Sequence, residues 1–371
     1  MTEIPTSSDE ITAEWLTTVL AEAGLSGGAT VQAIGKQRIG EGVGFIGELN
    51  RITLEFDGEP PAACPRSLIA KIPTSDEAYR SIAELLDLYG REHNFYQQVA
   101  ARTGISTPAV YHNAADADRH AYILLLEDLS HTRVGDQLAS CSIDDARLAL
   151  QEVARLHGGW WQSPQLAQFD WIPDSADPEY IALLKDVYQA GWPALLAKQG
   201  DELAEFPAGF IDIGDRFGKH FEEVFARMNE GPKTLAHFDY RLDNMLFDDS
   251  GDSTRLVVID WQLVHRSVGL LDVSYFLSGN FPVEVRRKLE REMVHYYHDQ
   301  LISNGVGDYS FDRCWEDYRL STLALLFFMV SNQNDIDLAK LNDRGQELIT
   351  AIFERYATTI LDVDAGAFLP D

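Results

Sequence analysis

The sequence predicts an α+β fold with two lobes: a small antiparallel sheet followed by a larger, mainly helical part. The chain of 371 residues is long enough to bury two hydrophobic cores. Short alternating apolar segments with glycine-rich turns, which are typical of strands, dominate the first third. Helical periodicity dominates the remainder. We therefore expect an N-terminal lobe over residues 1–128 and a C-terminal lobe over residues 129–371.

The composition is that of an ordinary globular protein, with 45% apolar and 11% aromatic residues. The formal net charge of −29 argues against nucleic acid or an anionic membrane surface as a partner. This charge fits a cationic substrate, and it also fits a solvated acidic surface that keeps the protein soluble. The carboxylates are spread along the chain, which favours the second interpretation. The composition leaves open whether the protein is a monomer or a homodimer.

Several features favour a cytoplasmic protein without membrane anchorage. The first ten residues are polar and acidic, whereas a secretory signal needs a basic start and an apolar core. The longest apolar run, Leu323–Val330, is too short to cross a bilayer and is typical of a buried helix. Three widely separated cysteines form neither a disulfide framework nor a zinc-binding pattern.

A packing helix is predicted over residues 8–20, followed by a glycine-rich turn over 39–47 and an alternating strand over 48–56. Glycine lets backbone N–H groups approach phosphates closely, so Gly42 and Gly44 are candidate nucleotide-binding positions. A flexible hairpin tip fits the same residues. The turn is not a Walker A loop, because that loop needs Gly-Lys-Ser/Thr leading into a helix.

A lysine and a glutamate are predicted to pair across the first lobe. Lys71 lies inside the apolar strand 67–73, where a lone lysine usually extends to solvent. Glu92 follows an acidic helix predicted over 76–89 that ends near Gly90, and it lies at helical spacing from apolar residues, which places it inward. Because a buried charge is costly unless it is paired, we predict an ion pair that aims the ammonium at the nucleotide phosphates.

The chain is predicted to leave the sheet at residues 127–129. Strands over 107–111 and 121–126 are joined by a turn over 113–119, and the second strand continues directly into Glu127 and Leu129. In a kinase architecture the backbone of such a connector hydrogen-bonds the adenine edge. Glu127 and Leu129 are therefore candidate nucleotide-binding residues through their main-chain atoms.

The second lobe begins with a helix over 146–157 that Ser142 caps. His157 ends this helix, and we interpret it as a structural histidine. The tryptophan-rich segment 158–232 is either an acceptor pocket or part of the core. Asp272 stands at a helix start, where it is predicted to accept backbone N–H groups and brace a neighbouring loop.

The strongest chemical pattern is His237-x-Asp239 with Asn244 five residues after the aspartate, followed by a predicted hairpin over 245–259 and then Asp260. Phosphoryl transfer needs a carboxylate that orients the attacking hydroxyl, and amide and carboxylate oxygens that hold magnesium. Asp239, Asn244 and Asp260 offer these groups in that order, and the hairpin returns Asp260 to face Asn244. A turn or a metallohydrolase ligand set explains the loop alone, but leaves the predicted lysine–glutamate pair unexplained.

Together these motifs resemble the aminoglycoside phosphotransferase and choline kinase superfamily, over roughly residues 30–280, and most closely its ecdysteroid-kinase-like branch. The motifs are the glycine-rich hairpin, Lys71, Glu92, Leu126-Glu-Asp-Leu129, His237-x-Asp239-x4-Asn244, Asp260-Trp-Gln262 and Gly269-x2-Asp272. The resemblance implies a two-lobed protein-kinase-like fold. It also implies ATP (with GTP less favoured), Mg²⁺ and a small hydroxylated molecule as phosphate acceptor.

The resemblance also implies roles for individual residues. Asp239 would orient or deprotonate the acceptor hydroxyl, while Asn244 and Asp260 would bind Mg²⁺. Lys71, held by its glutamate partner, would bind the phosphates. Arg241 would lie near the γ-phosphate and neutralise the charge that develops there.

Two residues depart from the family pattern: Phe238 replaces a common glycine, and Arg241 is not the usual residue at its position. No long activation segment with an Ala-Pro-Glu signature follows Asp260, so we expect no protein substrate. We therefore predict an ATP- and Mg²⁺-dependent kinase of a small molecule. The alternatives are an aminoglycoside O-phosphotransferase that confers antibiotic resistance, or a nucleotide-binding pseudokinase or sensor.

Overall fold

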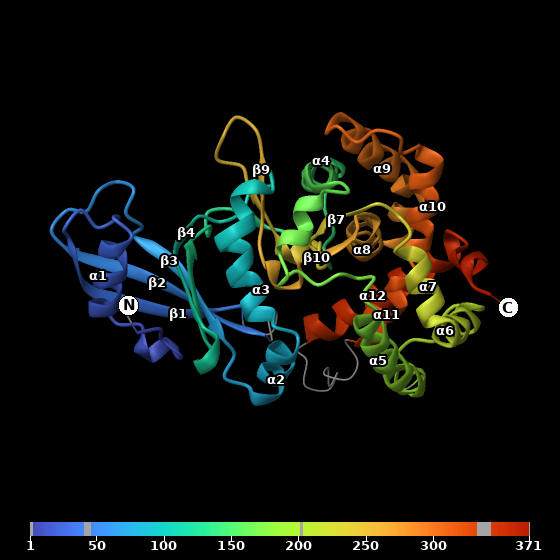
Figure 1. The fold of residues 1–371 in the computed structure, drawn as a ribbon, viewed down its shortest axis with the longest axis horizontal. Coiled ribbons are helices and arrows are strands. Elements are labelled where there is room, and N and C mark those ends of the chain that lie inside the picture. The colour runs from blue at the N-terminus through green and yellow to red at the C-terminus, as the bar shows by residue number, and fades with distance from the viewer. Residues whose placement is uncertain (1–2, 41–45, 201–202, 332–342, 371) are drawn as a thin grey trace.

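A computed structural model describes residues 3–40, 46–200, 203–331 and 343–370. It confirms the predicted α+β class: an antiparallel sheet forms one end of the molecule and helices form the other (Figure 1). The helix α3 (Leu88–Asn94) lies between the two. Gly42 and Gly44 fall outside the described residues.

The sheet has five strands in the order β1-β2-β3-β5-β4, and each neighbouring pair is antiparallel. Alternate residues of the strands face helix α1 (Ala13–Glu22), so that Ile52, Leu54 and Leu16 share one buried apolar cluster. The strands are β1 (Thr30–Ile39), β2 (Gly47–Asp57), β3 (Ser67–Pro73), β4 (Val110–Asp116) and β5 (Ala121–Glu127). The boundary after residue 128 stays a prediction.

Helices build the remainder around a second, larger apolar core. They are α4 (Ile143–Trp160), α5 (Pro178–Ala197), α6 (Phe210–Lys219), α7 (Phe221–Met228), α8 (Leu270–Asn280), α9 (Val283–Ser303), α10 (Phe311–Ser321), α11 (Ala324–Ser331) and α12 (Asp343–Asp362). This helical part also contains five short strands, which flank the loops that hold the sequence motifs. They are β6 (Arg133–Val134), β7 (Lys233–Ala236), β8 (Met245–Asp248), β9 (Arg255–Val258) and β10 (His265–Val268). Strand β8 pairs with β6 and β9, and β7 pairs with β10.

Two local predictions were wrong. Residues 76–89 form not one helix but α2 (Glu77–Leu85) and the start of α3 (Leu88–Asn94), because Asp87 adopts a left-handed conformation with φ of 51° between them. Gly90 lies inside α3 and does not end a helix. The turn predicted over 113–119 is mostly strand, since β4 extends to Asp116.

Other local predictions were confirmed. The Ser142 side chain accepts the Asp145 N–H at the start of α4, and β8 and β9 form the predicted hairpin. The tryptophans Trp160 and Trp192 of the tryptophan-rich segment are buried in the larger core. Over the described ranges, no helix is both long enough and apolar enough for a membrane span.

Candidate active site

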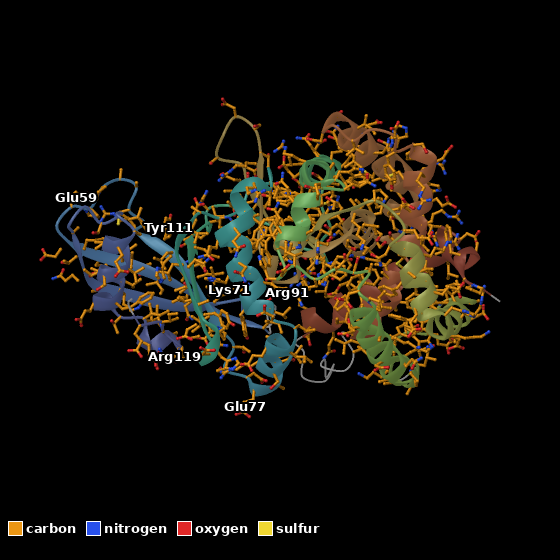
Figure 2. All side chains as sticks on the ribbon, viewed as in Figure 1. Glu59, Lys71, Glu77, Arg91, Tyr111 and Arg119 are labelled. Atoms are coloured by element: carbon orange, nitrogen blue, oxygen red, sulfur yellow. The ribbon has the colours of Figure 1, made fainter. Side chains whose placement is uncertain are left out.

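Lys71 lies between two carboxylates that come from distant parts of the chain. Its Nζ on β3 is 2.6 Å from Glu92 Oε2 on α3 and donates a hydrogen bond of 2.9 Å to Asp260 Oδ1, just beyond β9. Figure 2 shows Lys71 where the sheet meets α3. The predicted ion pair between Lys71 and Glu92 is therefore present, and Asp260 is a second partner that the sequence pattern did not indicate.

An aromatic stack fixes this geometry. Phe95, at the start of a π-helical turn over Phe95–Val99 that continues α3, stacks on Trp261 with ring centroids 4.1 Å apart and an interplanar angle of 7°. Both rings are fully buried. Because Phe95 lies one turn beyond Glu92 and Trp261 follows Asp260, the stack holds the two carboxylates beside the same ammonium.

Burial and the neighbouring charges have opposing effects on the pKa values of Lys71, Glu92 and Asp260. Burial lowers the pKa of Lys71, but the Asp260 and Glu92 carboxylates outweigh it and raise that pKa above its usual value. Burial raises the pKa of Glu92, which is 4% exposed, and the Asp260 charge adds to this effect. Burial also disfavours the Asp260 carboxylate, but the Lys71 ammonium dominates and lowers the pKa of Asp260. One cation is therefore shared by two acids.

A second group of hydrogen bonds organises the loop after β7. Asn244 Nδ2 donates to the Asp239 carbonyl at 2.9 Å and to Asp239 Oδ2 at 2.8 Å. The Ile259 N–H donates to the Asn244 carbonyl at 3.0 Å, which extends the β8–β9 hairpin by one pair and brings Asp260 next to Asn244. The three predicted side chains thus lie together at one end of the hairpin.

His237 and Asp272 hold the backbone of this loop. His237 Nδ1 accepts the Asp239 N–H at 3.2 Å, so in the neutral ring Nε2 donates to the Ile259 carbonyl at 3.0 Å. The Asp272 carboxylate accepts the backbone N–H groups of His237 and Phe238, each at 2.7 Å. The prediction that Asp272 accepts backbone N–H groups and holds a neighbouring loop is confirmed. His157 is also structural as predicted, because its two ring nitrogens bond Asp272 and Tyr297.

Arg241 makes a contact that sequence reasoning missed. Its Nε is 3.0 Å from Asp239 Oδ1, and its Nη1 donates to Gln137 Oε1 at 3.3 Å. Burial works against the charged guanidinium, but Asp239 and other nearby groups raise the pKa of Arg241 above its usual value. Arg241 therefore neutralises Asp239, and its predicted position beside the γ-phosphate stays a prediction.

The remaining predicted residues belong to the connector after β5. The Glu127 N–H donates to the Ala109 carbonyl at 2.9 Å, and the Leu129 carbonyl accepts the Thr132 N–H at 3.0 Å. The Asp128 carboxylate between them accepts from Arg51 and Ser67, which fixes the connector to β2 and β3. Adenine binding by this connector stays a prediction.

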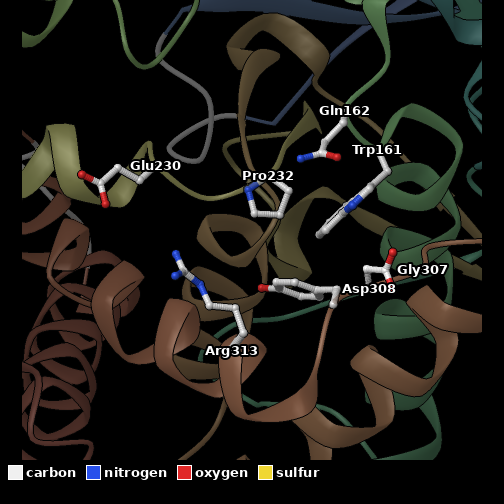
Figure 3. Close-up of a pocket in the computed structure, with 8 residues that line it drawn as sticks. Trp161, Gln162, Glu230, Pro232, Gly307, Asp308 and Arg313 are labelled. Atoms are coloured by element: carbon white, nitrogen blue, oxygen red, sulfur yellow. The ribbon is translucent and has the colours of Figure 1, made fainter.

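A separate hollow of about 470 Å³ lies at the end of α4 (Figure 3). Trp161, Glu230, Tyr309 and Arg313 are among the residues that line it. Tyr309 and Arg313 both bond Asp317, so each already has a polar partner. The hollow shares no residue with the predicted site.

The antiparallel sheet, the lysine shared between two acids and the His-x-Asp loop are the features of the kinase-like class of folds. The chain belongs to the ecdysteroid kinase-like family, whose sequence profile matches residues 41–305. No functionally curated protein sequence is significantly similar to it.

Solved structures show the same fold. Wild-type aminoglycoside 2'-phosphotransferase-IIIa in its GDP complex is 15% identical, with 94% of this chain and 99% of that chain covered and a TM-score of 0.55. An ethanolamine kinase from Plasmodium vivax is 11% identical, with 90% and 82% covered and a TM-score of 0.52. The profile match confirms the ecdysteroid kinase-like branch that the motifs resemble, and the shared fold agrees with it.

Proposed function

We propose that this protein transfers the γ-phosphoryl group of ATP to a hydroxyl group of a small molecule, with Mg²⁺ as cofactor. The observation that carries the proposal is the connected arrangement of five side chains: Lys71 joins Glu92 to Asp260, and Asn244 joins Asp239 to the same hairpin end. A structural ion pair does not need an amide and two further carboxylates beside it. Phosphoryl transfer needs all of these groups.

In the proposed reaction the acceptor oxygen attacks the γ-phosphorus and forms a new P–O bond. The bond between the γ-phosphorus and the β–γ bridging oxygen breaks, and the hydroxyl proton passes to Asp239 Oδ1 or Oδ2. The products are a phosphate monoester and ADP. Arg241 holds the Asp239 carboxylate in place, and Lys71 holds the α- and β-phosphates.

The donor chemistry near Asp260 fits magnesium. Asn244 Nδ2 is directed at Asp239, so the amide oxygen of Asn244 points away from that residue, and Asp260 contributes a carboxylate. Oxygen ligands of these two kinds suit Mg²⁺, which would neutralise phosphate charge when bound. We place the adenine against the Glu127 carbonyl and the Leu129 N–H. GTP is the second candidate nucleotide, because the similar aminoglycoside phosphotransferase is a GDP complex.

The test is an ATP-consumption screen across sterols, sugars, amino alcohols, nucleosides and aminoglycosides, with GTP run in parallel. We expect turnover with at least one hydroxylated compound. Asp239→Asn should lower kcat by about 10²- to 10⁴-fold, the usual contribution of a positioned base, and leave the nucleotide Kd nearly unchanged. Asp249→Asn, in the exposed β8–β9 turn, is the matched control.

Each alternative has its own outcome in this screen. Turnover of aminoglycosides, together with resistance of a susceptible host that expresses the protein, would establish the antibiotic kinase. Stabilisation by Mg-ATP without turnover of any acceptor would contradict the proposal and favour the sensor. We also propose a cytoplasmic location, with which the three free thiols of Cys64, Cys141 and Cys314 agree.

A further inference from the structure

Four side chains beside the catalytic loop have no part in the reaction described above. They come from four different segments: Arg91 from α3, Tyr180 from α5, Phe238 from the loop and His265 from β10. We call this group the Arg91 subsite. Phe238 directly precedes Asp239, so the subsite borders the position at which the acceptor hydroxyl would react.

Arg91 carries a charge that no residue of the described ranges neutralises by direct contact. It is 5% exposed, and among the residues that the structure describes its guanidinium has no hydrogen-bond or ion-pair partner. Asp87 and Tyr180 act on it only through space. Figure 2 labels Arg91, which lies on α3. A buried guanidinium is normally paired, because leaving it unpaired costs several kcal/mol.

His265 contributes a second unsatisfied polar atom. Its Nδ1 lies 2.6 Å from the Leu263 carbonyl and donates to it, so Nε2 of the neutral ring is an acceptor. This Nε2 is fully buried and has no partner among the described residues. Burial and the Arg91 charge lower the pKa of His265 to about 3, so the ring is neutral at physiological pH.

Aromatic rings surround these two polar groups. Phe238 stacks on His265 with ring centroids 4.3 Å apart, and the Tyr180 ring lies 5.2 Å from His265. Phe328 packs edge-on against Phe238 at 5.8 Å. Phe238, Tyr180 and Phe328 are each only partly buried, so flat apolar surface stays accessible next to the loop.

From these contacts we infer that the subsite binds an anionic oxygen group, such as a carboxylate, on the acceptor molecule. The inference rests on the proposed function and names its substrate class: a hydroxylated molecule with a planar or apolar body and an acidic substituent. Arg91 binds the anion through a charge-assisted hydrogen bond, and the partly buried aromatic rings pack on the body of the molecule. Polycationic acceptors are repelled by Arg91.

The test uses three probes with the same skeleton: 4-(hydroxymethyl)benzoate, its methyl ester and 4-(hydroxymethyl)benzylamine. Their Kd values are measured by calorimetry on the full chain, with a non-hydrolysable ATP analogue and Mg²⁺ present. We expect the carboxylate to bind about tenfold or more tightly than the ester, and the amine to bind most weakly. Arg91→Met should abolish the difference between carboxylate and ester, whereas Arg66→Met, on the exposed β2–β3 loop, should preserve it.

Thermal unfolding separates binding from a structural role. Because Arg91→Met removes an unpaired buried charge at similar volume, the ligand-free variant should melt at the same temperature as the wild type or higher. A lower Tm with unchanged carboxylate affinity would overturn the inference, and so would equal or undetectable binding of all three probes. Absence of ATP turnover in the acceptor screen would instead contradict the proposed function, while the charge preference in binding is measured independently of turnover.

Discussion

Phe238 has a left-handed backbone conformation, with φ of +70°. A side chain with a Cβ is disfavoured there, and glycine adopts this conformation without that strain. This explains why glycine is common at this position in the family that the motifs resemble. The ring of Phe238 gains contacts with His265 and Phe328 in return.

A comparison of Phe238→Gly with Phe238→Ala isolates the backbone strain, because both variants lack the ring. At a left-handed position glycine should be more stable than alanine by about 1 kcal/mol, the reverse of the order in helices and strands. Denaturant unfolding of the two variants measures this difference. An alanine variant as stable as the glycine variant would show that the loop relaxes to another conformation.

His265 predicts a pH dependence of stability. Its pKa of about 3 in the folded chain lies below the ordinary value of 6.5. Between these values the unfolded chain binds a proton that the folded chain does not, so the stability from His265 is present above pH 6.5 and is lost as the pH falls. His265→Gln should therefore flatten the fall in stability from neutral pH to about 5, by up to about 1.4 kcal/mol per pH unit. Equal slopes for variant and wild type would contradict the assignment.

Sequence reasoning found Asp239, Asn244 and Asp260 because a short loop and a hairpin fix their separation, and both are readable from local patterns. It also found the Lys71–Glu92 pair, since an inward acid needs a cation. It did not find Arg241 bonded to Asp239. A side chain two residues further along a loop can point in many directions. The direction of the Arg241 side chain depends on its hydrogen bond to Gln137, which lies 104 positions earlier in the chain.

Helix α8 positions the loop through a single carboxylate. Asp272, in its first turn, is 1% exposed and accepts two backbone N–H groups of the loop as well as bonding His157 of α4. Charge-assisted hydrogen bonds to a buried carboxylate are among the stronger ones in proteins. One side chain therefore joins two helices and the segment that carries Asp239.

The variant Asp272→Asn tests whether this carboxylate connects the two helices to the loop. The amide presents a donor where the carboxylate accepted, so one backbone N–H or His157 loses its partner, and unfolding should become easier by about 3 kcal/mol or more. Asp212→Asn, at an exposed position on α6, should change stability by less than about 0.5 kcal/mol. The free energy of unfolding in urea is the measurement. A loss at Asp272 no larger than that of the control would show that the loop is held by other contacts.

The errors in element prediction have a common cause. The α2–α3 break depends on Asp87 in a left-handed conformation, and packing at Gly90 leaves no room for a Cβ, which would lie 2.2 Å from the Asp87 carboxylate. β4 extends further than its turn-like residues suggest because β5 pairs with it as far as Asp116. In both places packing and strand pairing override the preferences of the individual residues. The β8–β9 hairpin was predicted well because its apolar strands and polar turn have residue preferences that agree with the pairing.

Lys71 connects the sheet to α3 and to the helical part of the molecule. The sheet contributes Lys71, α3 contributes Glu92 and the helical part contributes Asp260, from a position 189 residues after the lysine. The two acids share one cation, since Lys71 contacts both Glu92 and Asp260. A bound Mg-nucleotide would relieve this competition, because the phosphates attract the lysine and the metal attracts Asp260.

Nucleotide binding should therefore stabilise the entire chain. A ligand at about 100 times its Kd adds about 2.7 kcal/mol to the free energy of unfolding, which a rise in Tm with Mg-ATP measures. Asp260→Ala should lose most of the magnesium-dependent part of this rise, because the proposed metal ligand is gone. Asp239→Asn should keep it, since Asp239 is assigned to the acceptor hydroxyl. If Asp260→Ala responds to Mg-ATP as fully as Asp239→Asn does, the metal is held elsewhere. The hydrogen bond between Lys71 and Asp260 is then a purely structural link between the sheet and the helices.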